Sequence, residues 1–73
     1  MSRNRKEFMG QRIKAARTAA GLTQAELARY LGFHPVYISE LECGVRTPSV
    51  ATVIELSEVL NVTTDYILKG TTN

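Results

Sequence analysis

The chain has one cysteine, two prolines and no tryptophan among its 73 residues. A single cysteine excludes an internal disulfide framework and suits a reducing compartment. No apolar run approaches the roughly 18 residues of a membrane span. The charged N-terminus also lacks the apolar core that a signal peptide requires. We therefore expect a cytoplasmic protein without a membrane-spanning segment.

The residue clusters on which enzymes depend are also missing. The single histidine is His34, and no group of His, Cys, Asp and Glu has the spacing of a metal site. No nucleophile is paired with a base, and the glycines form no phosphate-binding loop. We therefore expect no enzymatic activity, no metal and no cofactor.

Positive charge is concentrated near the N-terminus, although the formal net charge is only +2. The first 17 residues contain six of the nine Lys and Arg residues and one acid, whereas the rest of the chain is net acidic. This distribution predicts either a basic face on the first helix or an ordinary solvated helix surface.

Helical patterns cover nearly the whole chain, and no stretch alternates in the manner of a strand. Thr23 and Glu26 have the spacing of a capping box, Pro35 suits a first helical position, and glycines mark several helix ends. We predict an all-α protein with helices over residues 6–20, 24–31, 35–43, 50–60 and 64–69. One domain over residues 6–70 would follow a flexible arm, 1–5, and precede a flexible tail, 71–73.

The stretch 24–43 is the centre of this pattern, because two short helices there are joined by a tight turn at Gly32. Apolar positions at helical spacing predict the buried sides of all the helices. On the first three helices these are Met9, Ile13, Ala16, Leu27, Ala28, Leu31, Phe33, Ile38 and Leu41; on the fourth they are Val50, Val53, Ile54, Leu56, Ser57 and Leu60. Two helices that cross steeply in this way present the second one to the DNA major groove.

Several segments together carry a family resemblance: GQRIKAAR, GLTQAELARYLG, Ile38-Ser39-x-Leu41-Glu42, GVRTPS and ELSEVLNVTTDYIL. From about Met9 to Gly70 the chain resembles the DNA-binding domain of the phage Cro/cI repressor and XRE family of transcriptional regulators. The resemblance implies a compact five-helix, lambda-repressor-like fold with a helix-turn-helix. It also implies a bacterial or phage regulator at the nucleoid, which binds double-stranded DNA at a pseudo-palindromic operator as a homodimer. From the sequence itself we expect no small-molecule ligand domain.

The resemblance further implies a role for individual residues. The residues expected to contact DNA phosphates are Arg17, Thr23, Gln24, Tyr37 and Arg46. Those expected to face the bases from the third helix, Pro35–Cys43, are His34, Pro35, Val36, Ser39 and Glu40. Arg17 and Glu42 would form a partly buried salt bridge between the first and third helices. The expected dimer interface comprises Val62, Thr63, Thr64, Tyr66 and Ile67.

The third helix departs from the family pattern, because it has no Gln, Arg, Asn or Lys for bidentate contacts to bases. Val36 suits a thymine methyl group and Glu40 a cytosine amine, whereas His34 is either a base contact or a polar turn residue. The apolar and acidic helix also supports an alternative function. In that alternative the chain is a protein-interaction module of the same fold, which modulates another regulator by mixed dimerisation.

Overall fold

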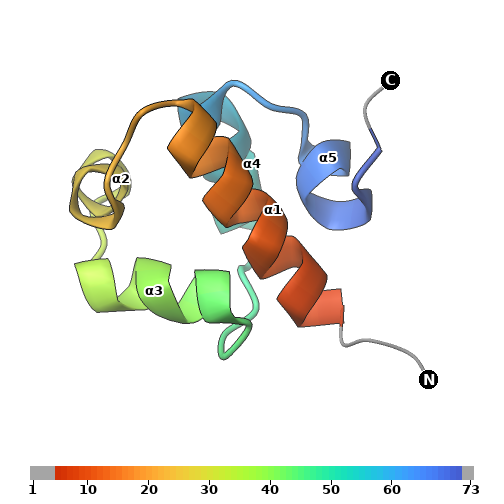
Figure 1. Cartoon of the computed structure of the whole chain (residues 1–73), viewed down its shortest axis with the longest axis horizontal. Helices are drawn as coiled ribbons and strands as arrows, with labels where there is room; N and C mark the ends of the chain where they lie inside the picture. The colour runs from red at the N-terminus through yellow and green to blue at the C-terminus, as the bar shows by residue number, and fades with distance from the viewer. Residues whose placement is uncertain (1–4, 72–73) are drawn as a thin grey trace.

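The computed structural model describes residues 5–71, and all its regular elements in this range are helices (Figure 1). They are α1 (Arg5–Ala19), α2 (Gln24–Leu31), α3 (Pro35–Cys43), α4 (Val50–Leu60) and α5 (Thr64–Lys69). The predicted all-α fold is confirmed, with the first helix displaced by one residue at each end. Arg5 therefore belongs to α1 and not to an arm; the rest of the predicted arm and residues 72–73 of the tail lie outside the described residues.

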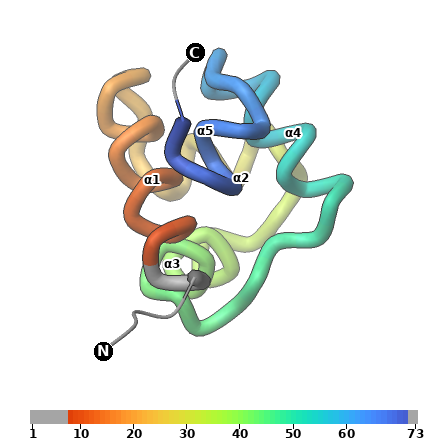
Figure 2. Tube along the Cα trace, turned by 90° about the vertical axis from the view of Figure 1, so that its right-hand side faces the viewer, coloured from red at the N-terminus to blue at the C-terminus, as the bar shows by residue number. Residues whose placement is uncertain are grey.

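Helix α1 crosses the middle of the molecule and contacts α3, α4 and α5 (Figure 1). Helices α2 and α3 lie on one side of α1, and α5 lies on the other. In the view turned by 90°, α3 lies at the lower end of the molecule and α5 near its upper part (Figure 2). The opposite placement of α3 and α5 leaves two separate surfaces for partners.

Side chains that cap the helices explain where the short helices begin. The predicted capping box is present: the Glu26 amide donates to Thr23 Oγ1 at 3.0 Å, and the Thr23 amide donates to Glu26 Oε1 at 2.8 Å. His34 caps α3 in the same way, because its ring Nδ1 accepts from the Val36 amide at 3.1 Å. Gly32 ends α2 with φ of +74°, a conformation that glycine adopts without steric cost.

The core lies where α1, α3, α4 and α5 converge with α2. Its fully buried large side chains are Ile13, Leu27, Ile38, Leu41, Leu56 and Ile67. On α4 the prediction is wrong in part: Val50 is 78% exposed and Ile54 is 46% exposed, whereas Thr52 is buried. Ser49 Oγ donates to Thr52 Oγ1 at 3.0 Å, and this bond satisfies the Thr52 hydroxyl inside the protein.

Gly10 lies where the backbones of α1 and α3 come closest, a role that its sequence position did not indicate. A Cβ atom at residue 10 would lie 2.5 Å from the carbonyl oxygens of both Leu41 and Glu42. Only glycine permits this approach, which brings the last turn of α3 against α1.

None of the helices described has the length and apolar character needed to cross a membrane.

Candidate nucleic-acid interface

Helices α2 and α3 form a helix-turn-helix whose second helix has an open outer side. In Figure 1 α2 is seen along its axis while α3 lies across the view, so the two helices cross steeply. Ile38 and Leu41 face the core with exposed fractions of 0% and 1%. The five predicted base-facing residues lie on the opposite side; we call them the outer surface of α3: His34, Pro35, Val36, Ser39 and Glu40.

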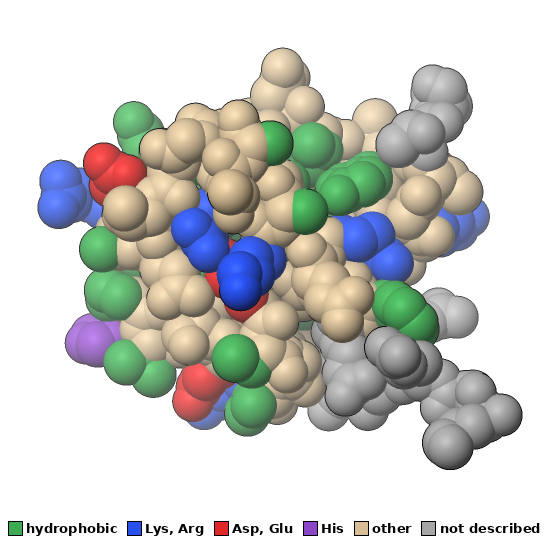
Figure 3. All heavy atoms as spheres, in the orientation of Figure 1, with side chains coloured by type: hydrophobic (Ala, Val, Ile, Leu, Met, Phe, Trp, Pro, Cys, Tyr) green, Lys and Arg blue, Asp and Glu red, His purple; other side chains and the backbone are tan. Residues whose placement is uncertain are grey.

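The outer surface of α3 is apolar near its N-terminal end, at Pro35 and Val36. Val36 is 56% exposed, and Pro35 and His34 are exposed beside it. Figure 3 shows hydrophobic side chains along the edge that α3 occupies, next to acidic and basic side chains that touch each other. Tyr37 lies at the side of this surface, half-buried, and its ring packs edge-on against Phe33 with centroids 4.8 Å apart.

The capping bond of His34 determines which ring atom is available for a partner. Because Nδ1 accepts the Val36 amide, the neutral ring carries its hydrogen on Nε2. His34 is therefore a turn residue that caps α3, and its Nε2–H is left as a donor at the N-terminal end of the outer surface.

A buried ionic network fixes the inner side of α3. Arg17 on α1 donates to Glu42 from Nε at 2.6 Å and from Nη2 at 3.1 Å, so the predicted salt bridge is present. Only 12% of the Arg17 side chain and 2% of the Glu42 side chain are exposed. Gln24 Nε2 donates to Glu42 Oε1 at 3.0 Å and joins α2 to the same carboxylate. The hydrogen bond with Glu42 raises the pKa of Arg17 above its ordinary value, which favours the charged form of the bridge.

Arg17 is held within the protein by this network, and its predicted phosphate contact stays a prediction. Its third nitrogen, Nη1, donates to the Leu22 carbonyl at 2.8 Å, so all three guanidinium nitrogens have partners within the protein. The Gln24 amide group has two hydrogens, and Glu42 accepts only one of them. Gln24 is half-buried at the start of α2 and thus keeps a donor for a second partner.

Arg12 likewise does not add to a basic face beside α3. Its Nε donates to the Ile67 carbonyl at 2.9 Å, and its Nη2 donates to the Leu68 carbonyl at 3.1 Å. Arg12 therefore ties α1 to the last turn of α5, where carbonyl groups lack helical partners. The sequence predicted either a basic face or an ordinary solvated surface for the first helix. Arg12 and Arg17 are bonded within the protein and do not form a basic face beside α3.

Arg46 is the arginine that lies beside the outer surface of α3. It follows α3 by three residues, and its Nε donates to Glu40 Oε1 at 2.9 Å. The two side chains are 61% and 33% exposed, respectively. The sequence indicated a separate DNA contact for each residue and gave no sign that they pair.

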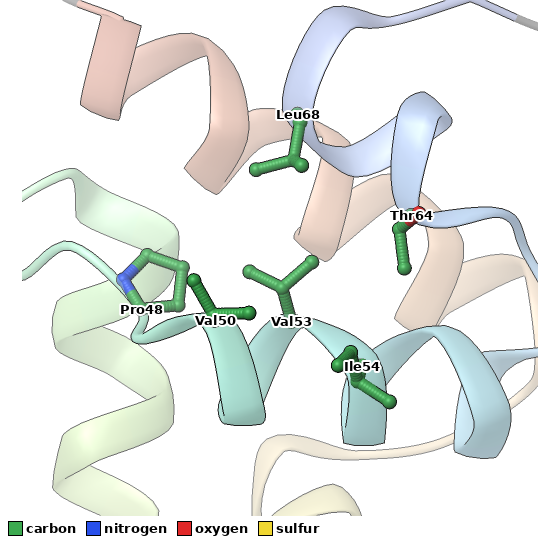
Figure 4. Close-up of a pocket in the computed structure, with 6 residues that line it drawn as sticks. All are labelled: Pro48, Val50, Val53, Ile54, Thr64 and Leu68. Atoms are coloured by element: carbon green, nitrogen blue, oxygen red, sulfur yellow. The ribbon is translucent and has the colours of Figure 1, made fainter.

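A second surface, on α4 and α5, includes part of the predicted dimer interface. Thr63 is exposed, and Val62, Thr64 and Tyr66 are half-buried. Ile67 is completely buried in the core, so its predicted place at an interface is corrected. Figure 4 shows a neighbouring groove of about 260 Å³ whose lining side chains come from the α3–α4 loop, α4 and α5. They are Pro48, Val50, Val53, Ile54, Thr64 and Leu68.

Comparisons with known proteins agree with this geometry. A family model described as Helix-turn-helix matches residues 13–67. The SPbeta prophage-derived HTH-type transcriptional regulator YonR of Bacillus subtilis is 39% identical over 64 residues, which are 88% of this chain and 59% of YonR. The chain spans about half the length of several curated relatives that it matches.

Solved structures with the same fold include two bound to DNA. The P22 c2 repressor in complex with synthetic operator 9T has a TM-score of 0.83 and 36% identity, and the match covers 88% of this chain and 97% of that one. SinR, a master regulator for biofilm formation, in complex with DNA has a TM-score of 0.78 and 35% identity. That match covers 84% of this chain and 98% of the SinR chain.

Proposed function

Because the chain belongs to the helix-turn-helix family of transcriptional regulators, we propose that it binds double-stranded DNA sequence-specifically as a homodimer. Helix α3 enters the major groove with the outer surface defined above. The single observation that supports this docking is the division of α3 into a buried side, with Ile38 and Leu41, and an open side of five residues. An open helix supported from behind by α2 is what a major groove admits.

The proposed phosphate contacts lie beside that helix. Thr23 Oγ1 accepts from Glu26, so its hydroxyl hydrogen is left to donate. Gln24, which keeps its second Nε2 hydrogen, opens α2, and a helix N-terminus favours an anion. The Tyr37 ring packs against Phe33, and its hydroxyl is a further proposed phosphate contact. Arg46, exposed in the loop after α3, is the fourth proposed contact.

The proposed dimer uses the α4–α5 surface, away from α3. Val50, Ile54 and Leu68 are 78%, 46% and 41% exposed around the groove of Figure 4, and the groove adjoins Thr64 of the predicted interface. A two-fold axis would set the same apolar patch of a second copy against it, so that both copies bury apolar area. This arrangement leaves both α3 helices free for half-sites about one helical turn, roughly 34 Å, apart.

The test is a binding-site selection on random double-stranded DNA, followed by titrations of the selected site at several salt concentrations. We expect a pseudo-palindrome and a steep salt dependence: neutralising ~6–10 phosphates lowers affinity by ~10³–10⁵ between ~50 and ~200 mM salt. Gln24→Ala should weaken binding with little change in the salt slope, because its amide group carries no charge. Lys69→Ala is the matched control, since Lys69 is exposed on α5 and its removal should leave both quantities nearly unchanged.

One observation favours a second function, namely the apolar character of the outer surface of α3. A protein-interaction module that modulates another regulator by mixed dimerisation would use Val36 and its neighbours against protein. In that case the selection would enrich no discrete site, and binding to the partner would be insensitive to salt.

A further inference from the structure

The outer surface of α3 lacks a side chain suited to guanine. Guanine presents two acceptors, O6 and N7, in the major groove, and an arginine satisfies both at once. Helix α3 contains no arginine, lysine, asparagine or glutamine, and its proposed base-facing residues offer at most one donor each. The nearest two-pronged donor in the described structure is Arg46, whose guanidinium is bonded to Glu40 on that surface.

Two connections hold Arg46 against α3. Gly44 ends the helix with φ of +81° and turns the chain back over its last turn. The amides of Val45 and Arg46 then donate to the Glu40 carbonyl at 2.9 and 3.2 Å. Because Arg46 Nε also donates to Glu40 Oε1 at 2.9 Å, both the backbone and the side chain of Arg46 are tied to the same residue. Arg46 thus behaves as an extension of α3 although it lies outside the helix.

The bond to Glu40 uses Nε of Arg46 and leaves the Nη1–Nη2 edge of its guanidinium for a partner. A guanidinium carries five N–H donors on a rigid plane, and Glu40 accepts from the Nε position. The Nη1–Nη2 edge lies at the far end of that plane, and the Arg46 side chain is 61% exposed. A carboxylate that holds Nε lowers the conformational entropy lost on binding, because the side chain is already fixed in direction.

Pairing also removes a penalty that Glu40 would otherwise impose. An uncompensated carboxylate on the major-groove surface would be repelled by the phosphates of the duplex. With Arg46 beside it, the pair is neutral overall, while the Arg46 side chain stays 61% exposed. A phosphate contact needs only the positive charge, whereas the bidentate edge and the carboxylate support suit a base.

We propose that Arg46, positioned by Glu40, recognises a guanine in each half-site through its Nη1–Nη2 edge. Arg46 is then a specificity-determining residue, and Glu40 is a positioning residue that contacts Arg46 rather than a base. This inference rests on the proposed function, and it replaces the phosphate contact proposed there for Arg46.

The experiment measures the affinity of the intact chain for two DNA duplexes. One is the operator obtained by selection, and the other has the candidate G·C pair of each half-site replaced by A·T. The unmodified chain should prefer the first duplex by roughly 5- to 150-fold per base pair, the range expected of a bidentate contact. Arg46→Ala should bind the two duplexes about equally well, whereas Lys69→Ala should keep the full preference.

Glu40 variants separate positioning from direct contact. Glu40→Gln should reduce the preference for guanine while raising the affinity for unrelated DNA, because one negative charge is removed. When Arg46 is already Ala, adding Glu40→Gln should change the preference no further. If Glu40→Gln still changed the relative affinity for the two duplexes in that background, Glu40 itself would contact the base pair and the proposal would be overturned.

The outcomes also distinguish this proposal from the broader one. If Arg46→Ala weakens binding equally on every duplex and the selected sequence stays the same, Arg46 is a phosphate contact and the inference is wrong. A chain that selects no DNA sequence at all would instead refute the proposed function. Circular dichroism of each variant should match that of the unmodified chain, since the exposed pair contributes little to folding.

Discussion

The third helix carries two glutamates, Glu40 and Glu42, and each pairs with an arginine in a different environment. Glu42 faces inward, where its side chain is 2% exposed and three hydrogen bonds from Arg17 and Gln24 reach its oxygens. Glu40 faces outward, where its side chain is 33% exposed and Arg46 Nε donates to it. The same pair of residue types therefore occurs on both sides of one helix.

Solvent exposure gives the two pairs different consequences. Exposed pairs contribute about 0–1 kcal/mol to stability, because water screens the charges and long side chains lose entropy when they are fixed. A buried carboxylate that loses its partners costs far more, since its desolvation is no longer compensated. We infer that the inner pair holds the helix-turn-helix together and that the outer pair serves recognition.

The largest expected effect is on the inner pair. Glu42→Ala leaves the buried donors of Arg17 and Gln24 without their acceptor, and it should lower the free energy of unfolding by about 3–5 kcal/mol. A chain of this length has only about 4–11 kcal/mol in total, so urea denaturation should show a large fall in the midpoint. The control is Glu58→Ala, an exposed glutamate on α4; equal losses in both variants would contradict the assignment.

Gly10→Ala should break the close approach on which the inner pair depends. The added Cβ would meet the Leu41 and Glu42 carbonyl oxygens at 2.5 Å, so α1 and α3 must separate. We expect a loss of about 1–3 kcal/mol in unfolding free energy, although alanine is the better helix former. Gln11→Ala, at the exposed next position, should be nearly neutral in the same thermal melts. A stabilised Gly10→Ala variant would show that the contact is looser than the structure indicates.

The outer pair should matter little for folding. Arg46→Ala and Glu40→Ala should each change the free energy of unfolding by no more than about 0.5 kcal/mol, the usual range at exposed positions. Urea denaturation measures this directly, alongside the two variants above. A loss from Arg46→Ala comparable to that from Glu42→Ala would show that the two pairs do not differ in the way described.

The smallest effect is the response of each pair to salt. A double-mutant cycle on Arg46 and Glu40 should give a coupling of a few tenths of a kcal/mol. At ~1 M salt the screening length falls to ~3 Å, and this coupling should disappear. The coupling between Arg17 and Glu42 should persist at the same salt concentration, because water and ions have little access to it. Equal salt sensitivity would mean that the inner pair opens readily to solvent.

Helix positions were predictable because the signals for them are local. The capping box at Thr23, Pro35 at the start of α3 and the glycines after each short helix act within one turn of the chain. The predicted ranges of α2, α3, α4 and α5 agree with the structure residue for residue. Only α1 differs, by one residue at each end.

Side-chain partners were harder to predict, because they depend on distances between segments far apart in the sequence. The Arg17–Glu42 bridge was anticipated from the family resemblance. The bonds from Arg12 to α5 and from Gln24 to Glu42, and the outward positions of Val50 and Ile54, were not. The spacing of apolar residues suggests which side of a helix is buried. The packing of the other helices determines which side of α4 is actually buried.

By itself, then, the sequence determined the number, order and limits of the helices and the side of α3 that stays open. Capping and periodicity operate within a few residues and need no tertiary contact. The partner of each arginine side chain was decided only by the tertiary structure. A guanidinium is long enough to reach several acids or backbone carbonyls, and the packing of the helices determines which of them it contacts. That selection placed Arg12 and Arg17 in internal contacts and left Arg46 beside the outer surface of α3.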